Sequence, residues 1–480
     1  MKSWTGLFIG AGFSYEAGMP LVWELTAEIK RWLTAEKLAE FNESWRAQGG
    51  GQSDVILAEF HAMLQRPDMH YEAVLGYLET QARRQRTNSG EYHYLYSWLV
   101  QLVSYLLYWR HIQSRGFLDA NLPLYDGVKV LAEQSAPLWV FSLNHDVVME
   151  AIAARLGIKL HSGFSPEIVG LPLRDTRGRV KGKLNAELLT EDTLERHALY
   201  FPNPPEPGIY LLKLHGALDI FATNDGKDLL KLLPAHAGQQ GPVDSLFAVN
   251  EDLYFPEPGS PRGRANIMNE IAYADEQGVM QFLRRSLLAG AHKFDKRHSQ
   301  TLPMSMMKHF QANLNFVSHL VCIGYGFGDI HINQVIRDWL EFTDSRTLEI
   351  VGPDCHSVPA FLLHVAPQVS MNAQSATAWL DGRAGIQRTS RERVEKRLRD
   401  MIRKMDKDAG ADEPHSAESL RQVQVFLRIA ERLEMTSEDA VFGPAGIVAV
   451  AQMWSKEKGL TQGVFLERLE NLVFKGTRGA

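Results

Sequence analysis

The chain has 480 residues, 45% of them hydrophobic and 22% charged, so it can bury a large core and shows no composition typical of disorder. Its formal net charge of −6 lacks the basic excess that usually accompanies nucleic-acid binding. The two cysteines, Cys322 and Cys355, form no C-x-x-C pair, which excludes a disulfide framework and a four-cysteine zinc site within one chain.

Signals for membranes and secretion are weak throughout the sequence. No apolar run reaches the length of a transmembrane helix. The N-terminus has one lysine and then an apolar run that is broken by glycine and is too short for a signal peptide. We therefore expect a cytoplasmic protein, and the length favours two domains or one domain with large insertions.

The first clear pattern in chain order is residues 4–25, WTGLFIGAGFSYEAGMPLVWEL, which predicts a strand, a glycine turn and the start of a helix. The turn consists of Gly10, Ala11 and Gly12. Glycines here let the backbone turn tightly and let a phosphate approach main-chain N–H groups. Ser14 and Tyr15 stand where the third glycine of G-x-G-x-x-G would fall, so the turn indicates either a dinucleotide site or an ordinary strand-to-helix connection.

Four further short apolar runs are predicted to be strands. They comprise residues 137–142, 209–214, 319–324 and 347–351. Together with residues 6–9 they alternate with helical segments, which favours a parallel sheet covered on both faces and therefore an α/β fold.

Two long segments outside this alternation carry helical spacing. Residues 26–117 are expected to form a large helical insertion, and residues 376–480 a C-terminal helical region. The helices expected in the second of these are 391–405, 419–434, 446–456 and 464–474.

Two other segments lack such regular spacing. Residues 163–207 contain four closely spaced prolines, which indicates a surface loop. Residues 222–316 are expected to form a second insertion, part loop and part helix, with helices at 281–288 and 306–312.

Polar side chains follow each of the five predicted strands at the point where the strand ends. In an open α/β sheet the carboxyl ends of the strands border the crevice in which ligands bind, so we expect these side chains to lie close together. They are Ser14, Asn144, Asp146, His215, Asp329 and Asp354.

Three of these side chains are candidates for chemistry. His215 is either a structural histidine or a general base, and its place beside Gly216 at a strand end favours the base, since an imidazole can take a ribose hydroxyl proton near neutral pH. Asn144 either caps a helix or binds a sugar hydroxyl or a water, and Asp146 either caps the same helix or accepts from an amide such as the nicotinamide carboxamide.

The turn after the fourth strand, GYGFGD at 324–329, has glycines at alternate positions. It permits close approach to a sugar or a phosphate, and the alternative is a flexible turn. Asp329 or Asp354 can hydrogen-bond an adenosine ribose, and the sequence leaves the choice between them open.

Four motifs occur in an order that resembles the sirtuin (SIR2) family, over about residues 4–354. They are GAGFSYEAGMP at 10–20, FSLNHD at 141–146, KLHG at 213–216 and IGYGFGD at 323–329. The resemblance implies a Rossmann-like parallel sheet with helices on both faces, within an NAD-binding catalytic domain of residues 1–375.

The resemblance also implies roles for single residues. Asn144 and His215 are expected to be catalytic, and Asp146 is expected to contact nicotinamide. The residues expected around the dinucleotide are Gly10, Ala11, Gly12, Ser14, Gly324, Gly326, Phe327 and Asp329.

The sequence departs from the sirtuin deacylases in two places. It has no paired C-x-x-C motifs for their zinc module, and Leu21-Val22-Trp23 stands where they carry Asp-Phe-Arg. The chain is therefore more similar to the zinc-less bacterial SIR2 effectors of anti-phage defence. That similarity implies hydrolysis of NAD to nicotinamide and ADP-ribose without zinc. The alternatives are a catalytically silent NAD- or ADP-ribose-binding module and, third, a lysine deacylase.

Family similarity also implies that NAD cleavage is regulated by assembly, as abortive infection requires. The expected partners are a second copy of the chain, in a homo-oligomer, or a HerA-type ATPase. Neither a membrane nor nucleic acid is expected to bind.

Overall fold

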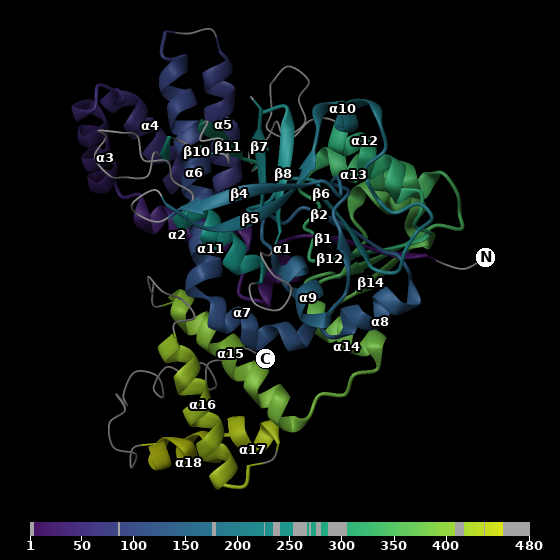
Figure 1. Cartoon of the computed structure of the whole chain (residues 1–480). Helices are drawn as coiled ribbons and strands as arrows, with labels where there is room; N and C mark the ends of the chain where they lie inside the picture. The colour runs from purple at the N-terminus through teal and green to yellow at the C-terminus, as the bar shows by residue number, and fades with distance from the viewer. Residues whose placement is uncertain are drawn as a thin grey trace.

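The structure is a computed structural model that describes residues 4–84, 87–174, 179–224, 226–233, 241–252, 266–267, 270–274, 280–286, 305–408, 417–435 and 437–454. Over these ranges the chain forms two seven-stranded sheets, a helical insertion and a group of C-terminal helices (Figure 1). Every helix in the described part is too short or too polar to span a lipid bilayer.

The first sheet is parallel throughout, in the order β14-β13-β12-β1-β2-β6-β3. Its strands are β1 (Thr5–Ile9), β2 (Leu138–Ser142), β3 (Leu160–His161), β6 (Ile209–Lys213), β12 (His319–Ile323), β13 (Thr347–Val351) and β14 (Val369–Asn372). All five strands expected from the sequence lie in this sheet, which confirms the α/β fold. The strands β3 and β14 are additional.

The strand order makes this sheet Rossmann-like. From β1 the chain moves outward on one side to β2 and β6, and it then returns to the other side of β1 at β12. Gly6 of β1 accordingly pairs with Trp139 of β2 and with Leu320 of β12. Ligands of doubly wound sheets bind outside the carboxyl ends of the strands where the order reverses, so the ends of β1 and β12 are the expected site.

Helices cover both faces of the parallel sheet, because alternate residues of each strand point to opposite sides. Leu7 and Ile9 of β1 share a hydrophobic cluster with α8 (Gly127–Gln134), α9 (Val148–Leu156) and α14 (Ala376–Ala384). Phe8 faces the other side with α12 (Ser305–Leu314), α13 (Ile330–Glu341) and η2 (Ala360–Gln368), and its ring lies 5.7 Å from that of Phe310.

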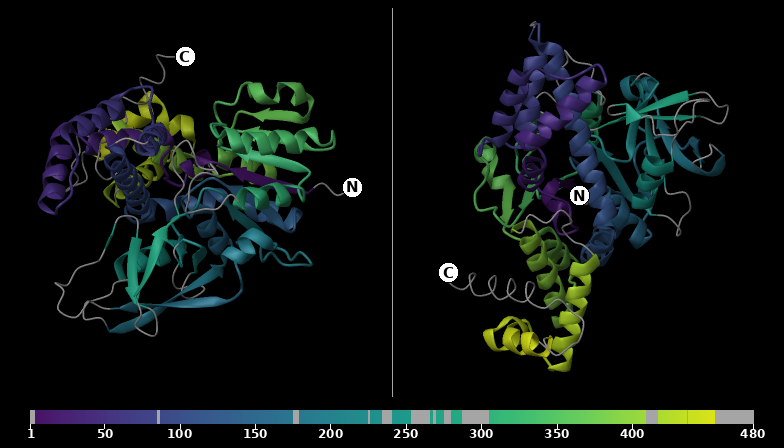
Figure 2. Two further views of the ribbon diagram at one scale, coloured as in Figure 1. Left: turned by 90° about the horizontal axis from the view of Figure 1, so that it is seen from above. Right: turned by 90° about the vertical axis from the view of Figure 1, so that its left-hand side faces the viewer.

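The segment expected as a large insertion is helical, as predicted. After α1 (Ala11–Tyr15) it comprises α2 (Val22–Trp32), α3 (Ala35–Ala47), α4 (Asp54–Gln65), α5 (Tyr71–Arg83), α6 (Ser89–Gln113) and α7 (Arg115–Asn121), and η1 (Leu122–Tyr125) leads back to the sheet. The helices α3 to α6 lie at one end of the molecule and α16 to α18 at the opposite end, as Figure 2 also shows.

The second sheet is antiparallel and lies beside the first, in the order β4-β5-β8-β7-β11-β10-β9. Its strands are β4 (Ile168–Arg174), β5 (Val180–Leu189), β7 (Ile220–Thr223), β8 (Asp228–Leu233), β9 (Asn266–Ile267), β10 (Glu270–Ala274) and β11 (Met280–Arg285). Two further helices of this part of the chain are α10 (Glu191–Arg196) and α11 (Pro242–Asp252).

This second sheet corrects two expectations. The surface loop predicted for 163–207 contains β4 and β5, and the helix predicted for 281–288 is the strand β11. The reason is pairing between strands, which local spacing does not reveal. β11 pairs with β10 and, through Arg284 and Arg285, with β7 residues more than sixty positions earlier. The helix expected at 306–312 is confirmed by α12.

The C-terminal region is helical over its described residues, as predicted. α14 packs on the core so closely that a Cβ added at Gly127 would lie 2.5 Å from Leu380 O. A separate hydrophobic cluster around Leu398 and Phe426 begins one helix later. Its helices are α15 (Ser390–Asp408), α16 (Ala417–Arg432), α17 (Glu438–Phe442) and α18 (Pro444–Trp454). The helix expected at 464–474 lies outside the described residues.

Candidate functional site

A cavity of about 630 Å³ opens at the carboxyl edge of the parallel sheet, where the strand order reverses. Turns after β1, β2, β6 and β12 line one part of it, and the starts of α2 and α5 line another. We call the first part the glycine end, lined by Gly10, Ala11, His215, Gly324, Tyr325, Gly326 and Asp329. We call the second the insertion end, lined by Leu21, Trp23, Leu25, His70, Tyr71, Glu72 and Leu107.

Main-chain contact between two turns forms the glycine end. Gly10 N donates to Ile323 O at 3.0 Å, and Gly12 N donates to Gly324 O at 3.0 Å. Gly324 has a φ of +64°, and a Cβ there would lie 2.4 Å from Gly12 Cα. The N–H groups of Gly10 and Gly12 therefore hold the two turns together. Because Gly10, Gly12 and Gly324 have no room for side chains, the backbone itself reaches the cavity at this contact.

Asn144 ties the turn after β2 to the turn after β1. Its Nδ2 donates to Gly10 O at 2.9 Å and to Ser14 Oγ at 3.0 Å. It does not cap α9, so the helix-cap alternative is wrong for this residue. Since both amide hydrogens are engaged, Oδ1 is the side-chain atom that Asn144 can offer to a ligand in the cavity.

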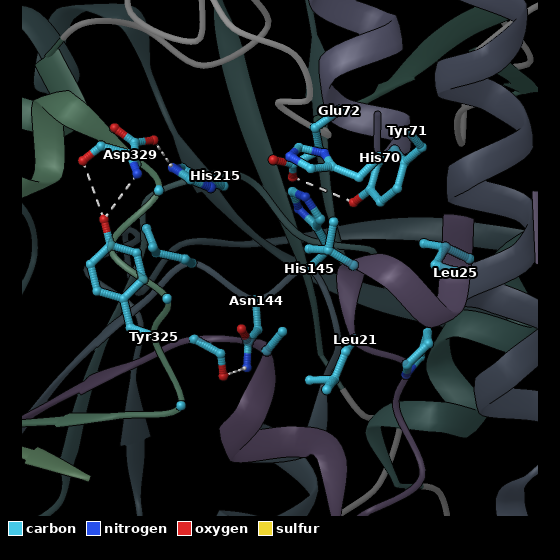
Figure 3. Close-up of a pocket in the computed structure, with 18 of the residues that line it drawn as sticks. Leu21, Leu25, His70, Tyr71, Glu72, Asn144, His145, His215, Tyr325 and Asp329 are labelled. Atoms are coloured by element: carbon cyan, nitrogen blue, oxygen red, sulfur yellow. Dashed lines mark hydrogen bonds and ion pairs between the residues drawn. The ribbon is translucent and has the colours of Figure 1, made fainter. Parts of the chain in front are cut away.

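His215 and Asp329 meet at the glycine end, as Figure 3 shows. His215 Nε2 lies 3.2 Å from Asp329 Oδ2, an ion-pair distance, and both side chains are largely buried. The other carboxylate oxygen, Oδ1, accepts from His331 N at 3.1 Å and from Ile332 N at 3.3 Å at the start of α13. The helix start thereby fixes the carboxylate beside the imidazole.

Tyr325 completes this arrangement at the end of β12. Its OH donates to Asn333 Oδ1 at 2.9 Å and accepts from Asp329 N at 3.3 Å. Burial raises the pKa of Tyr325, and the nearby Asp329 carboxylate raises it further, so the phenol remains a neutral donor.

Asp146 caps α9, as one of its two alternatives predicts, and it also lines the cavity. Its Oδ1 accepts from Val148 N at 3.0 Å at the start of α9. The buried Lys213 stabilises this turn, because its Nζ donates to Asn144 O at 3.3 Å and to Asp146 O. Lys213 also lies 3.3 Å from Glu150 Oε1, so its charge is paired.

The second sheet contributes to the same buried charge cluster. Lys231 of β8 lies 3.2 Å from Glu150 Oε1 and also pairs with Asp219. Burial by itself would lower the pKa of Lys231, but the carboxylates of Asp219 and Glu150 outweigh burial and raise it. Two buried lysines and two buried carboxylates therefore form one paired cluster, and Lys213 connects this cluster to the turn after β2.

His111 of α6 joins the helical insertion to this turn. Its Nε2 accepts from Val147 N at 3.2 Å, and its Nδ1 lies 2.8 Å from Leu107 O, to which it donates. The side chain is fully buried, and burial lowers the pKa of His111, so the ring is neutral with its proton on Nδ1.

Side chains, rather than main chain, line the insertion end. The indole of Trp23 is half exposed and meets the His70 ring edge-on, at 5.5 Å and 89°. Tyr71 N donates to Thr26 Oγ1 at 3.0 Å, which fixes the start of α5 to α2. No sequence motif marks these residues, because they come from helices that only tertiary packing brings together.

The structure brings most of the predicted site residues together. Those that line the cavity are Gly10, Ala11, Asn144, Asp146, His215, Gly324, Gly326 and Asp329. Gly12 and Ser14 lie directly behind this wall, bonded to Gly324 and Asn144. Phe327 and Asp354 are not among the lining residues. The Phe327 ring packs instead between Tyr325 and Phe361, at 4.7 and 5.7 Å.

In the described part of the chain, no three histidine, cysteine or acidic side chains come together as metal ligands would. The sequence matches no protein-family model and no curated protein.

Proposed function

We propose that the chain is an NAD glycohydrolase, which splits NAD and water into nicotinamide, ADP-ribose and a proton. The observation that carries this proposal is the convergence of Asn144, Asp146 and the His215–Asp329 pair on one cavity at the switch point of a Rossmann-like sheet. In such sheets this crevice suits a dinucleotide. The volume of the cavity is in the range of small-molecule sites.

The glycine end suits the diphosphate, since Ala11 and Gly326 present backbone without bulky side chains. Asp146 suits the carboxamide of nicotinamide, whose N–H₂ group can donate to a carboxylate. When the bond between nicotinamide and ribose C1′ breaks, its electron pair leaves with nicotinamide and the ribose becomes oxocarbenium-like. Water then bonds to C1′ and loses one proton.

His215 is placed to take that proton, and the Asp329 carboxylate 3.2 Å away stabilises the imidazolium that results. Asn144 is placed to orient the water or a ribose hydroxyl through Oδ1, because Nδ2 is held by Gly10 and Ser14. The interaction of Asn144 then acts mainly in the transition state.

The test is to incubate the purified chain with NAD and to measure free nicotinamide, with and without a chelator. We expect turnover that the chelator leaves unchanged. His215→Ala should lower turnover by about two orders of magnitude or more in a folded protein. Asn144→Ala should lower kcat and kcat/KM together while NAD still binds, as calorimetry can show.

Two other outcomes would favour the alternatives. Binding of NAD or ADP-ribose without release of nicotinamide would identify a regulatory binding module. Cleavage of an acyl-lysine peptide would identify a deacylase. If both variants keep the wild-type rate, the assignment of Asn144 and His215 is wrong.

The resemblance to the zinc-less SIR2 effectors supports a biological role for this activity. We propose that the chain is a cytoplasmic, NAD-depleting effector of anti-phage defence that acts by abortive infection. Its activity would then be controlled in a homo-oligomer or by a HerA-type ATPase. Mass measurement in solution, combined with NAD turnover on the same sample, tests this role.

A further inference from the structure

The C-terminal helix α15 carries an arginine that reaches the wall of the cavity. Arg403 donates through Nη1 to Tyr15 O and through Nη2 to Met19 O, the latter at 2.6 Å. Nη2 also lies 3.1 Å from Glu24 Oε2, and the guanidinium carbon lies 3.5 Å from the centre of the Tyr15 ring. The side chain is almost fully buried. One residue of the C-terminal region thus holds three points within residues 15–24.

The residues around Arg403 are also linked to one another through Glu24. Tyr15 OH donates to Glu24 Oε1 at 3.3 Å, and Leu21 N donates to Glu24 Oε2 at 3.2 Å. Met19 and Leu21 line the cavity directly. The guanidinium therefore links the end of α1, the connection to α2 and the first turn of α2, and the connection borders the cavity through Met19 and Leu21.

Two other residues of α15 also anchor the helix. Lys396 Nζ lies 2.7 Å from Glu16 Oε1, within the same segment, whereas Arg399 contacts a different part of the molecule. Arg399 Nη1 donates to Ala120 O of α7 at 3.0 Å and to Glu395 Oε1 at 3.1 Å. Ala120 does not line the cavity. Since Arg399 is also a largely buried arginine of α15 bonded to a main-chain carbonyl, it serves as a matched control for Arg403.

We propose that Arg403 is a positioning residue of the site, which holds residues 15–24 in the shape that fits the substrate. The C-terminal helical region then contributes to substrate binding although none of its described residues lines the cavity. This inference rests on the proposed NAD hydrolysis. Asn144, His215 and Asp329 come from other elements, so the effect of Arg403 should appear in KM and not in kcat.

The experiment compares Arg403→Ala, Arg403→Lys and Arg399→Ala in the full chain. For Arg403→Ala we expect KM for NAD to rise about tenfold or more, with kcat within about threefold of wild type. Methylguanidinium in solution should restore part of the lost affinity of this variant. Lysine keeps the charge but lacks the planar fork and stacks less well on Tyr15, so Arg403→Lys should lie between wild type and Arg403→Ala. Arg399→Ala should leave KM unchanged.

Hydrogen exchange of residues 15–24 provides a readout that does not depend on NAD. These amides should exchange about tenfold faster or more in Arg403→Ala and at the wild-type rate in Arg399→Ala. If the alanine variant does not fold, Arg403→Lys carries both comparisons.

Unchanged KM with unchanged exchange would overturn the positioning role, and so would an equal rise in KM for Arg399→Ala. A wild-type chain that does not hydrolyse NAD would refute the proposed function instead. The exchange comparison would then decide alone whether Arg403 holds the wall.

Discussion

The two ends of the cavity differ in that main-chain atoms form one wall and side chains form the other. At the glycine end, two turns touch through main-chain atoms, with Gly12 N bonded to Gly324 O and no space for a Cβ between them. At the insertion end, side chains such as Trp23, His70 and Tyr71 form the wall, and they belong to helices outside the parallel sheet.

This difference separates two kinds of recognition. A backbone wall suits a group that many ligands share, such as a diphosphate, and a larger residue at the contact between Gly12 and Gly324 disturbs the sheet as well as the site. A wall of side chains can change its residues without moving the sheet, so it is where selectivity for one ring or headgroup can be set. Substitutions at this glycine contact should therefore damage stability and turnover together, and substitutions at the insertion end should alter binding.

The largest effect is expected for Gly324→Ala. The new Cβ would lie 2.4 Å from main-chain atoms of Gly12 and Phe13, and alanine is strained at a φ of +64°. Overpacking and strain together should lower the free energy of unfolding by about 3 kcal/mol, with loss of NAD turnover. Thermal unfolding and a nicotinamide assay measure the two effects.

Gly326→Ala is the matched control for this substitution. Gly326 also lines the cavity, but a Cβ there would meet no atom within 4 Å. We expect its free energy of unfolding to stay within about 0.5 kcal/mol of wild type. If the two variants are equally stable, close contact between the turns is not what holds the glycine end together.

The sequence predicted the glycine end far better than the insertion end, for a physical reason. Each strand of the parallel sheet and its glycine turn are contiguous in the chain, and the rule that carboxyl ends share one edge then brings Asn144 and Asp329 to Gly10. The insertion end has no such rule. His70 and Trp23 meet only because α5 packs on α2, through contacts such as that between Tyr71 N and Thr26 Oγ1.

The same limit explains the other misses. The spacing at 281–288 predicts a helix because it carries no sign that β11 pairs with β10 and β7. The resemblance implies that Phe327 contacts the dinucleotide, but its large apolar ring instead packs against the partly buried Phe361 at the edge of the core. Arg403 stands in a helix whose alternating charges indicate a solvated face, and nothing local shows that one arginine is buried.

An intermediate effect is expected for His111→Leu, which removes the link between the insertion and the turn after β2. Val147 N would lose its acceptor, at a cost of about 1–3 kcal/mol in the free energy of unfolding at pH 7.5. The pKa of His111 is lowered by burial, so below about pH 6.5 the unfolded chain takes up a proton that the folded chain does not.

The stability that depends on neutral His111 is therefore complete above about pH 6.5 and is lost as the pH falls toward the lowered folded-state pKa. As the pH falls through this interval, the free energy of unfolding should decrease more steeply for wild type than for His111→Leu. The difference in free energy between the two proteins should therefore shrink. Denaturant unfolding from pH 7.5 to 5 measures it. A pH-independent difference between wild type and His111→Leu would show that burial does not keep the ring neutral.

The smallest effect is expected for Trp23→Ala at the insertion end. The indole lines the cavity, is 51% exposed and packs edge-on against His70, so its loss removes ligand contact and little core packing. A contact made equally in the ground state and the transition state changes KM alone. One aromatic contact is worth about 1 kcal/mol, so KM for NAD should rise about three- to tenfold with kcat unchanged.

Trp32, on the same helix and 42% exposed, provides the control. It lies outside the cavity and carries Lys37 over its ring, so Trp32→Ala should leave KM for NAD unchanged. Should Trp23→Ala instead lower kcat and kcat/KM together, the insertion end takes part in the transition state, and the division of labour between the two ends does not hold.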